Sequence, residues 1–106
     1  MQVSFLHIVR VDVDAEVEEA FNEWYDRVHI PAILACPGWL SAKRYVSIDE
    51  GPKYAAVYEV AGTWAYETPE YAEAKGFHEF TPAVHNFMRQ RLQYLGAPSA
   101  EGSKPR

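Results

Sequence analysis

The sequence has a single cysteine and no cluster of basic residues, and these two shortages exclude several classes of protein. Cys36 is the only cysteine in 106 residues, so neither an internal disulfide framework nor a cysteine-rich zinc site can form. Lys and Arg number 10 against 15 Asp and Glu, which gives a formal net charge of −5. An acidic chain without a basic cluster binds nucleic acids and anionic membranes poorly. We therefore expect neither as a partner.

Long hydrophobic runs and recognisable catalytic or cofactor motifs are also missing. No stretch approaches the ~18 apolar residues that a membrane-spanning helix needs, and the N-terminus runs straight into an expected strand. The sequence contains no H-E-x-x-H pattern, no glycine-rich phosphate loop and no G-x-S-x-G motif. These absences predict a cytoplasmic protein with no membrane partner, no metal site and no cofactor.

The composition is that of one globular domain. Apolar residues make up 48% of the chain and aromatic residues 14%. A chain of this length can bury roughly 60–70% of its unfolded surface, which is enough for a core. We expect a single domain over residues 1–97. Residues 98–106 include no large apolar side chain, and we expect them to form a disordered tail.

The first half of the chain predicts a strand followed by a helix. Residues 3–11 are apolar on both alternating faces, which is typical of a strand at the centre of a sheet. Apolar residues recur at steps of three and four over residues 17–28, which indicates an amphipathic helix. Asp14 is the expected N-cap of this helix, and Pro31 is expected to end it or to restart a short turn.

The second half predicts two strands, a helix and a last strand. Alternating residues indicate strands over 39–48 and 54–60, and the short connection makes this pair antiparallel. Thr68 precedes a proline at the first helical position, which predicts a helix over 69–75. Residues 87–95 are interpreted as a final strand, with a helix end as the alternative.

The order strand, helix, strand, strand, helix, strand is that of the α+β, ferredoxin-like βαββαβ fold. Such a fold has a four-stranded antiparallel sheet with two helices on one face. The opposite face then needs a cover, and at this length a second copy of the chain supplies one most simply. We therefore predict a homodimer joined through the sheet face.

His29 is the leading candidate for proton transfer, because histidine titrates closest to neutral pH. It lies with Tyr25 at the edge of the apolar helix stripe, where side chains face the gap between helix and sheet. Asp26, three residues earlier, is expected to accept a hydrogen bond from the imidazole and fix its tautomer. The alternative is a histidine that interacts with the C-terminal end of the helix dipole.

Further residues are candidates for binding a substrate. His7 stands on an apolar strand face, either as a hydrogen-bonded core residue or as part of a pocket. Tyr58 can donate a hydrogen bond into that pocket, with core anchoring as the alternative. The side chains expected to complete its walls are Phe21, Trp24, Phe77, His78 and Phe80, for which plain packing is the alternative. Lys43 and Arg44 point to opposite strand faces, so one is expected to be solvated and the other to meet an anionic ligand or an acidic residue.

One stretch of the sequence resembles a known family. The run WYDRVHIP over residues 24–31, followed by PGW at 37–39 and RY at 44–45, resembles the pattern of EthD-like proteins of the dimeric α/β-barrel superfamily. The similarity covers about residues 3–95. It implies a two-fold dimer joined through its sheets and a small-molecule cleft between each sheet and its helices. Within the matched pattern, it implies that His29 is the residue held for chemistry.

Three functions remain open at this point. The first is a cofactor-independent lyase, isomerase or cyclase that acts on a small apolar, cyclic or aromatic metabolite through acid–base chemistry of His29. The second is a haem-binding monooxygenase, because His7, Trp64 and His78 fall roughly where the haem-degrading branch of the superfamily has its site residues; that branch usually has Asn at the first position. The third is a non-catalytic dimeric protein that binds a small molecule.

Overall fold

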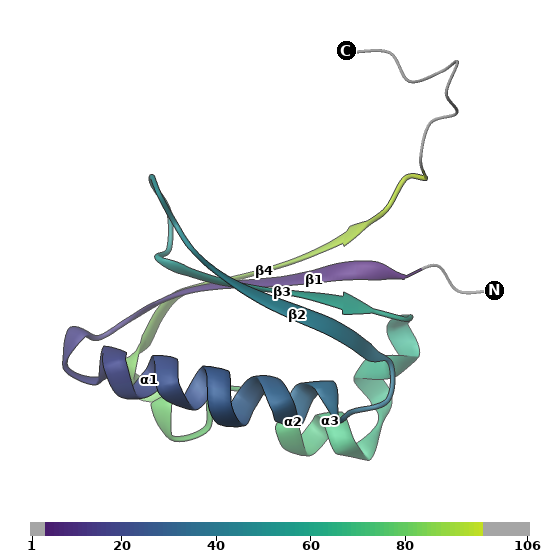
Figure 1. Cartoon of the computed structure of the whole chain (residues 1–106), viewed down its shortest axis with the longest axis horizontal. Helices are drawn as coiled ribbons and strands as arrows, with labels where there is room; N and C mark the ends of the chain where they lie inside the picture. Colours follow the sequence, from purple (N-terminus) through teal and green to yellow (C-terminus); the bar gives the residue numbers. More distant parts are fainter. Residues whose placement is uncertain (1–3, 97–106) are drawn as a thin grey trace, which may run out of the picture.

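In the computed structural model, which describes residues 4–96, helices α1, α2 and α3 all lie on one face of a four-stranded antiparallel sheet (Figure 1). The strands follow the order β2-β3-β1-β4. They are β1 (Phe5–Val13), β2 (Trp39–Val46), β3 (Tyr54–Val60) and β4 (Val84–Gln93). The predicted ferredoxin-like α+β fold is confirmed, whereas the predicted tail over 98–106 lies outside the described residues.

The helical layer consists of short segments. They are a 3₁₀ turn (Ala15–Val17), α1 (Glu18–Trp24), a π turn (Tyr25–His29), α2 (Ile30–Leu34), a 3₁₀ segment (Thr63–Glu67), α3 (Pro69–Ala74) and a second 3₁₀ segment (His78–Ala83). Within residues 4–96, no helix is long and apolar enough to cross a membrane.

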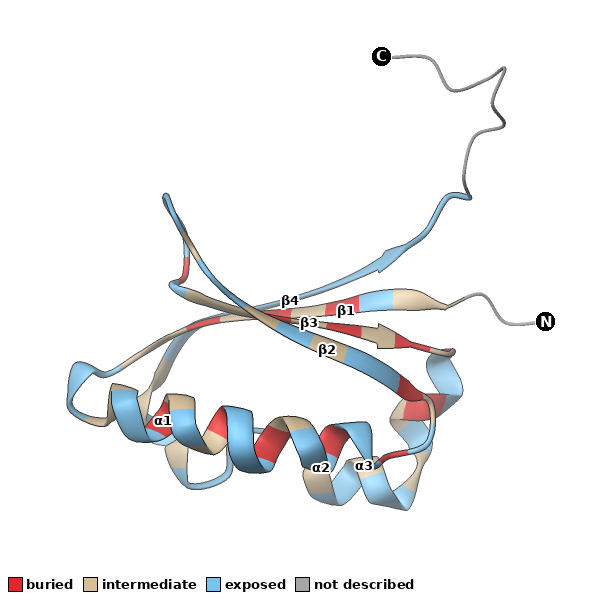
Figure 2. Cartoon of the chain, in the orientation of Figure 1, coloured by how far each residue is buried: buried red, intermediate tan, exposed pale blue. Residues whose placement is uncertain are grey.

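Strand β1 lies between β3 and β4, as its apolar sequence predicts. His7, Val9 and Val11 are buried, and they point toward the helices. Leu6 and Ile8 point the other way, and Leu6 is 40% exposed. Among residues 4–96, helices cover only that side of the sheet, so β1 buries one face against them and the opposite face has no helix over it (Figure 2).

Of the two alternatives predicted for Pro31, the structure shows the second, because the helix does not end there and the short helix α2 begins beside the proline. Helical segments follow one another without a gap from Ala15 to Leu34, and Ile30 donates its backbone N–H to the carbonyl of Tyr25, five residues earlier. A proline inside an α-helix lacks one hydrogen bond, and its ring collides with the carbonyl four residues earlier. The wider π turn just before Pro31 shifts the hydrogen-bond register, so α2 can begin with the proline near its first position.

Of the two predicted N-caps, only Thr68 acts as one. Its hydroxyl accepts the backbone N–H of Tyr71 at 3.1 Å and so begins α3. Asp14 makes no side-chain cap. Its Oδ1 lies 2.8 Å from Nε2 of His85 on β4, so a contact between distant segments replaces the local one.

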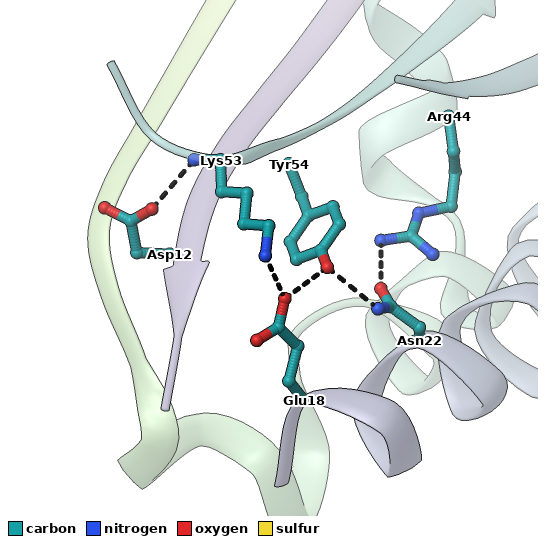
Figure 3. Close-up of polar contacts among 6 residues, drawn as sticks. All are labelled: Asp12, Glu18, Asn22, Arg44, Lys53 and Tyr54. Carbon is teal, nitrogen blue, oxygen red and sulfur yellow. Dashed lines mark hydrogen bonds and ion pairs between the residues drawn. The ribbon is translucent and has the colours of Figure 1, made fainter. Parts of the chain in front are cut away.

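A polar cluster fastens α1 to the sheet beside the β2–β3 connection (Figure 3). Glu18 accepts hydrogen bonds from Nζ of Lys53 at 2.7 Å and from the hydroxyl of Tyr54. These bonds lower the pKa of the Glu18 carboxyl. Asn22 extends this series of hydrogen bonds, since its side chain donates to the Tyr54 hydroxyl at 3.1 Å and accepts from Arg44 at 2.9 Å. The cluster sets where α1, and therefore the π turn that follows it, lies over the sheet.

Candidate functional site

A cavity of about 340 Å³ lies between the sheet and the helical layer. Its walls are mostly aromatic and apolar, and its polar groups are few. The lining residues are His7, Val9, Tyr25, His29, Ile33, Trp39, Tyr58, Tyr71, Ala72, Lys75, Gly76, Phe77, Phe87 and Arg89. All four strands, the π turn, α2 and α3 contribute lining residues, so the cavity forms only in the complete fold.

His29 is buried at the end of the π turn, with 6% of its surface exposed. Its ring stacks on Trp24 at a centroid distance of 4.8 Å and meets the edge of Tyr25 at 4.8 Å. Burial, with a smaller effect of His78 and Arg44, lowers the pKa of His29 to about 4. The imidazole is thus neutral at pH 7. Within residues 4–96 no group forms a hydrogen bond with either ring nitrogen, which leaves both for a ligand.

Tyr25 and His29 are the first and last residues of the π turn, and both line the cavity. The sequence places them at the edge of an α-helical stripe, but they are 3% and 6% exposed. A π turn holds more residues than an α turn, so it rotates the side chains that follow it. Short π segments are found frequently at functional sites.

His7 is both a hydrogen-bonded core residue and part of the cavity wall. Its Nδ1 lies 2.8 Å from the hydroxyl of Tyr66, and its ring meets Trp39 and Tyr58 edge-on. Burial is the main reason that the pKa of His7 falls to about 4, and the nearby arginines of β4 add to it. His7 therefore fits both interpretations that the sequence allowed.

Tyr25 and Tyr58 bring their hydroxyl groups together at 3.3 Å beneath the cavity. Burial raises the pKa of both phenols, so both stay protonated in the neutral range. The guanidinium of Arg44 lies over the Tyr25 ring, 4.5 Å from its centroid. One hydroxyl donates to the other, so the pair leaves one O–H free to donate to a ligand in the cavity.

Asp26 does not orient His29, and that prediction is wrong. Its Oδ1 accepts a hydrogen bond from Arg44 at 3.1 Å, and its side chain is 61% exposed. The carboxylate therefore lies on the outer side of the helix, where Arg44 of β2 reaches it. Lys43, the neighbour of Arg44, is exposed, so Arg44 is the cation of this pair that meets an acid.

The predicted wall residues divide between the cavity and the packing around it. Phe77 lines the cavity. Phe21 is fully buried and Phe80 packs edge-on against it at 5.6 Å, so for these two plain packing is the correct interpretation. Trp24 and His78 line a second hollow of about 420 Å³ on the other side of His29, and they do not reach the first.

Several lining residues were not singled out from the sequence. Trp39 and Tyr71 stack at a centroid distance of 4.7 Å and form a flat wall. Lys75 follows Tyr71 by four residues, just beyond the end of α3, and Arg89 follows Phe87 by two along β4. The spacing in β4 places Phe87 and Arg89 on one face of that strand, and Lys75 comes one helical turn after Tyr71. The sequence carries this signal, but it does not show which face turns toward the cavity.

The comparisons with known proteins place this architecture in a family. A family model described as "Domain of unknown function (DUF4286)" matches residues 4–93. The chain belongs to this family. A search of curated protein sequences finds no match.

Solved structures share the fold of this DUF4286 chain. An EthD family protein from Bacillus halodurans matches with a TM-score of 0.61 at 13% identity, over 81% of this chain and 96% of that one. A dimeric ferredoxin-like protein from an uncultured marine organism gives 0.67 at 18% identity, over 91% of each chain. SnoaB, a cofactor-independent oxygenase from Streptomyces nogalater, gives 0.51 at 13% identity, over 93% and 96%. The resemblance to EthD-like proteins is thus confirmed at the level of the fold.

The residues that suggested haem do not share a site in the DUF4286 chain. His7 lines the first cavity, whereas His78 lines the hollow on the other side of His29. Trp64 is 44% exposed and lies against Gly38. These three side chains therefore do not line one common cavity. Among residues 4–96, no three His, Cys, Asp or Glu side chains gather as a metal site would require.

Proposed function

We propose that this DUF4286 chain is an enzyme that transfers protons on a small, largely apolar ring compound bound between sheet and helices. The supporting observation is the convergence of two neutral imidazoles and two neutral phenols in one aromatic cavity of about 340 Å³. Ligand cavities measure roughly 300–1,000 Å³ and combine apolar walls with a few convergent polar groups. The size suits a compound of one or two rings.

His29 is the proposed acid–base residue. As a neutral imidazole with no partner among residues 4–96, it can take a proton from a carbon beside a substrate carbonyl. The electron pair of the broken C–H bond moves onto the carbonyl oxygen, which becomes an enolate. That negative charge in turn raises the pKa of His29, because opposite charges stabilise each other.

Tyr58, Tyr25 and His7 are the proposed partners of the substrate oxygen. A hydroxyl donor fixed at the cavity floor stabilises an oxyanion as it forms, and it needs no rearrangement to do so. His29 then returns the proton to a different carbon, which completes an isomerisation. Alternatively, a leaving group departs, which completes an elimination.

We further propose that the enzyme is a homodimer joined through the open face of the sheet. Leu6 and Leu92, which pair across β1 and β4, are 40% and 48% exposed on that face, and Met88, farther along β4 on the same face, is 44% exposed. The similar marine protein is described as dimeric. A second copy would cover these apolar side chains.

A binding screen followed by a proton-exchange assay tests the enzyme proposal. Cyclic ketones, lactones and phenols are screened by thermal shift, and compounds that raise Tm by several degrees are incubated in D₂O. We expect deuterium to enter the bound compound at one carbon. Acid–base residues typically contribute roughly 10²–10⁴-fold, so His29→Asn should slow this exchange by at least about tenfold.

His85→Asn is the matched control, because His85 is a surface histidine paired with Asp14 outside the cavity. It should leave exchange unchanged. Tight binding without deuterium uptake would identify a binding protein instead of an enzyme. Undiminished exchange in a folded His29→Asn variant would remove His29 from the mechanism.

A further inference from the structure

In the described part of the chain, the charged residues that line the cavity are cations, although the chain is acidic overall. Asp and Glu outnumber Lys and Arg by 15 to 10 in the sequence. Among residues 4–96, the charged side chains that line the cavity are Lys75 and Arg89 alone. A site lined by positive side chains without negative ones has a positive potential, and such a potential favours an anionic ligand.

Arg89 reaches the cavity because of the register of β4. It pairs with Val9 across the sheet, and Arg91 pairs with His7, so both arginines share the helix-facing side with those residues. Arg91 lies over the ring of Tyr66, 5.5 Å from its centroid. Neither arginine forms an ion pair with an acidic residue in the described part of the chain.

Lys75 approaches from the opposite layer. It directly follows α3, one turn after Tyr71, and its backbone N–H closes that turn on the Tyr71 carbonyl. Its side chain is exposed, and between residues 4 and 96 no carboxylate pairs with it. Two unpaired cations from separate elements, one of the sheet and one of the helical layer, therefore border the same cavity.

We infer that the ligand of this cavity is a ring-bearing carboxylate, with its carboxylate at Arg89 and Lys75 and its ring against the stacked wall of Trp39 and Tyr71. This inference rests on the proposed function and names its substrate class. The arginine fork binds a carboxylate through two parallel hydrogen bonds, and lysine adds a point charge. With its carboxylate bound at these cations, the ligand would present its ring to His29.

A matched pair of probes tests the charge of the ligand. The anion 2-naphthoate and its neutral isostere 2-naphthamide are titrated into the whole protein by calorimetry at low and high salt. We expect 2-naphthoate to bind at least about tenfold more tightly at low salt. The preference should shrink as salt is added, whereas binding of the amide should stay constant.

Substitutions assign the preference to its residues. Arg89→Gln and Lys75→Gln should each reduce 2-naphthoate affinity several-fold and leave 2-naphthamide within about twofold. Arg27→Gln is the control, because Arg27 is 77% exposed on the helix and pairs with Glu23. It removes one positive charge away from the cavity and should change neither probe.

The possible failures of the two proposals are distinguishable. Equal affinity for the two probes, or a preference that survives both substitutions, would overturn the carboxylate inference and leave a cavity that binds neutral rings. Failure of both probes to bind at millimolar concentration would overturn the ring-binding cavity itself, and the proposed function with it.

Discussion

At the scale of single residues, His7 and His29 are two histidines that the fold keeps uncharged. Each is about 95% shielded from solvent, and the pKa of each falls to about 4. His29 faces His78 and Arg44, and His7 faces Arg89 and Arg91, so the neighbouring charges act in the same direction as burial. Both imidazoles therefore meet a ligand as neutral groups.

This burial predicts that the protein loses stability between pH 6.5 and about 4. The unfolded chain takes up protons on these histidines near pH 6.5, but the folded chain does not until about pH 4. The free energy of unfolding should fall by about 1.4 kcal/mol per pH unit for each histidine across this window. Urea denaturation from pH 8 to pH 4.5 measures it.

Substitution of the two buried histidines tests their part in this loss of stability. His7→Asn and His29→Asn should each reduce the slope by about one proton. The lowered pKa values of Asp12 and Glu18 also remove stability in acid, but below their ordinary values of 3.8 and 4.5. A stability that stays flat from pH 6.5 to 4.5 would contradict neutral, buried histidines.

At the scale of elements, the turn that leads into β2 depends on Gly38. Gly38 has a φ of +89°, and a Cβ added there would lie 2.7 Å from Cβ of Ala65 and 2.8 Å from the ring of Trp64. Gly76, after α3, has a similar φ of +92° with no heavy atom within 4 Å of that position. A substitution at either glycine would therefore meet the same backbone strain, but only at Gly38 would the new side chain also meet neighbouring atoms.

Gly76→Ala should cost about 1 kcal/mol, because an L-residue at positive φ is strained by roughly 1–2 kcal/mol. Gly38→Ala should cost that amount and at least about 1 kcal/mol more, since Ala65 and Trp64 must move. Urea denaturation of both variants gives the difference directly. Equal losses would show that the segment around Ala65 yields without cost.

At the scale of the whole molecule, the open sheet face decides the proposed assembly. Light scattering at micromolar concentration should give twice the chain mass of 12.1 kDa. Leu92→Lys places a charge opposite Leu6 on that face and should shift the mass to that of one chain, while the circular dichroism spectrum stays the same. Val28→Lys, an equally exposed site on the helical face, is the control. A wild-type mass of 12.1 kDa would refute the dimer.

The sequence by itself determined the elements and their order. Strand β3 begins and ends at the predicted residues 54 and 60, and Thr68 caps α3 as expected. Period-two and period-3.6 patterns and a threonine before a proline act over a few neighbouring residues, so they can be read locally. The fold follows from that order, because few connections join six such elements in a short chain.

Only the tertiary structure decided which side chains meet. The spacing of Asp26 and His29 suggested a pair, but Arg44 of β2 takes the carboxylate, and the π turn rotates His29 into the core. Trp39 and Arg89 reach the cavity through strand register and packing, which no local pattern encodes. Side-chain burial and charge pairing depend on neighbours distant in the chain, so the site exists only once the sheet and helices have closed on each other.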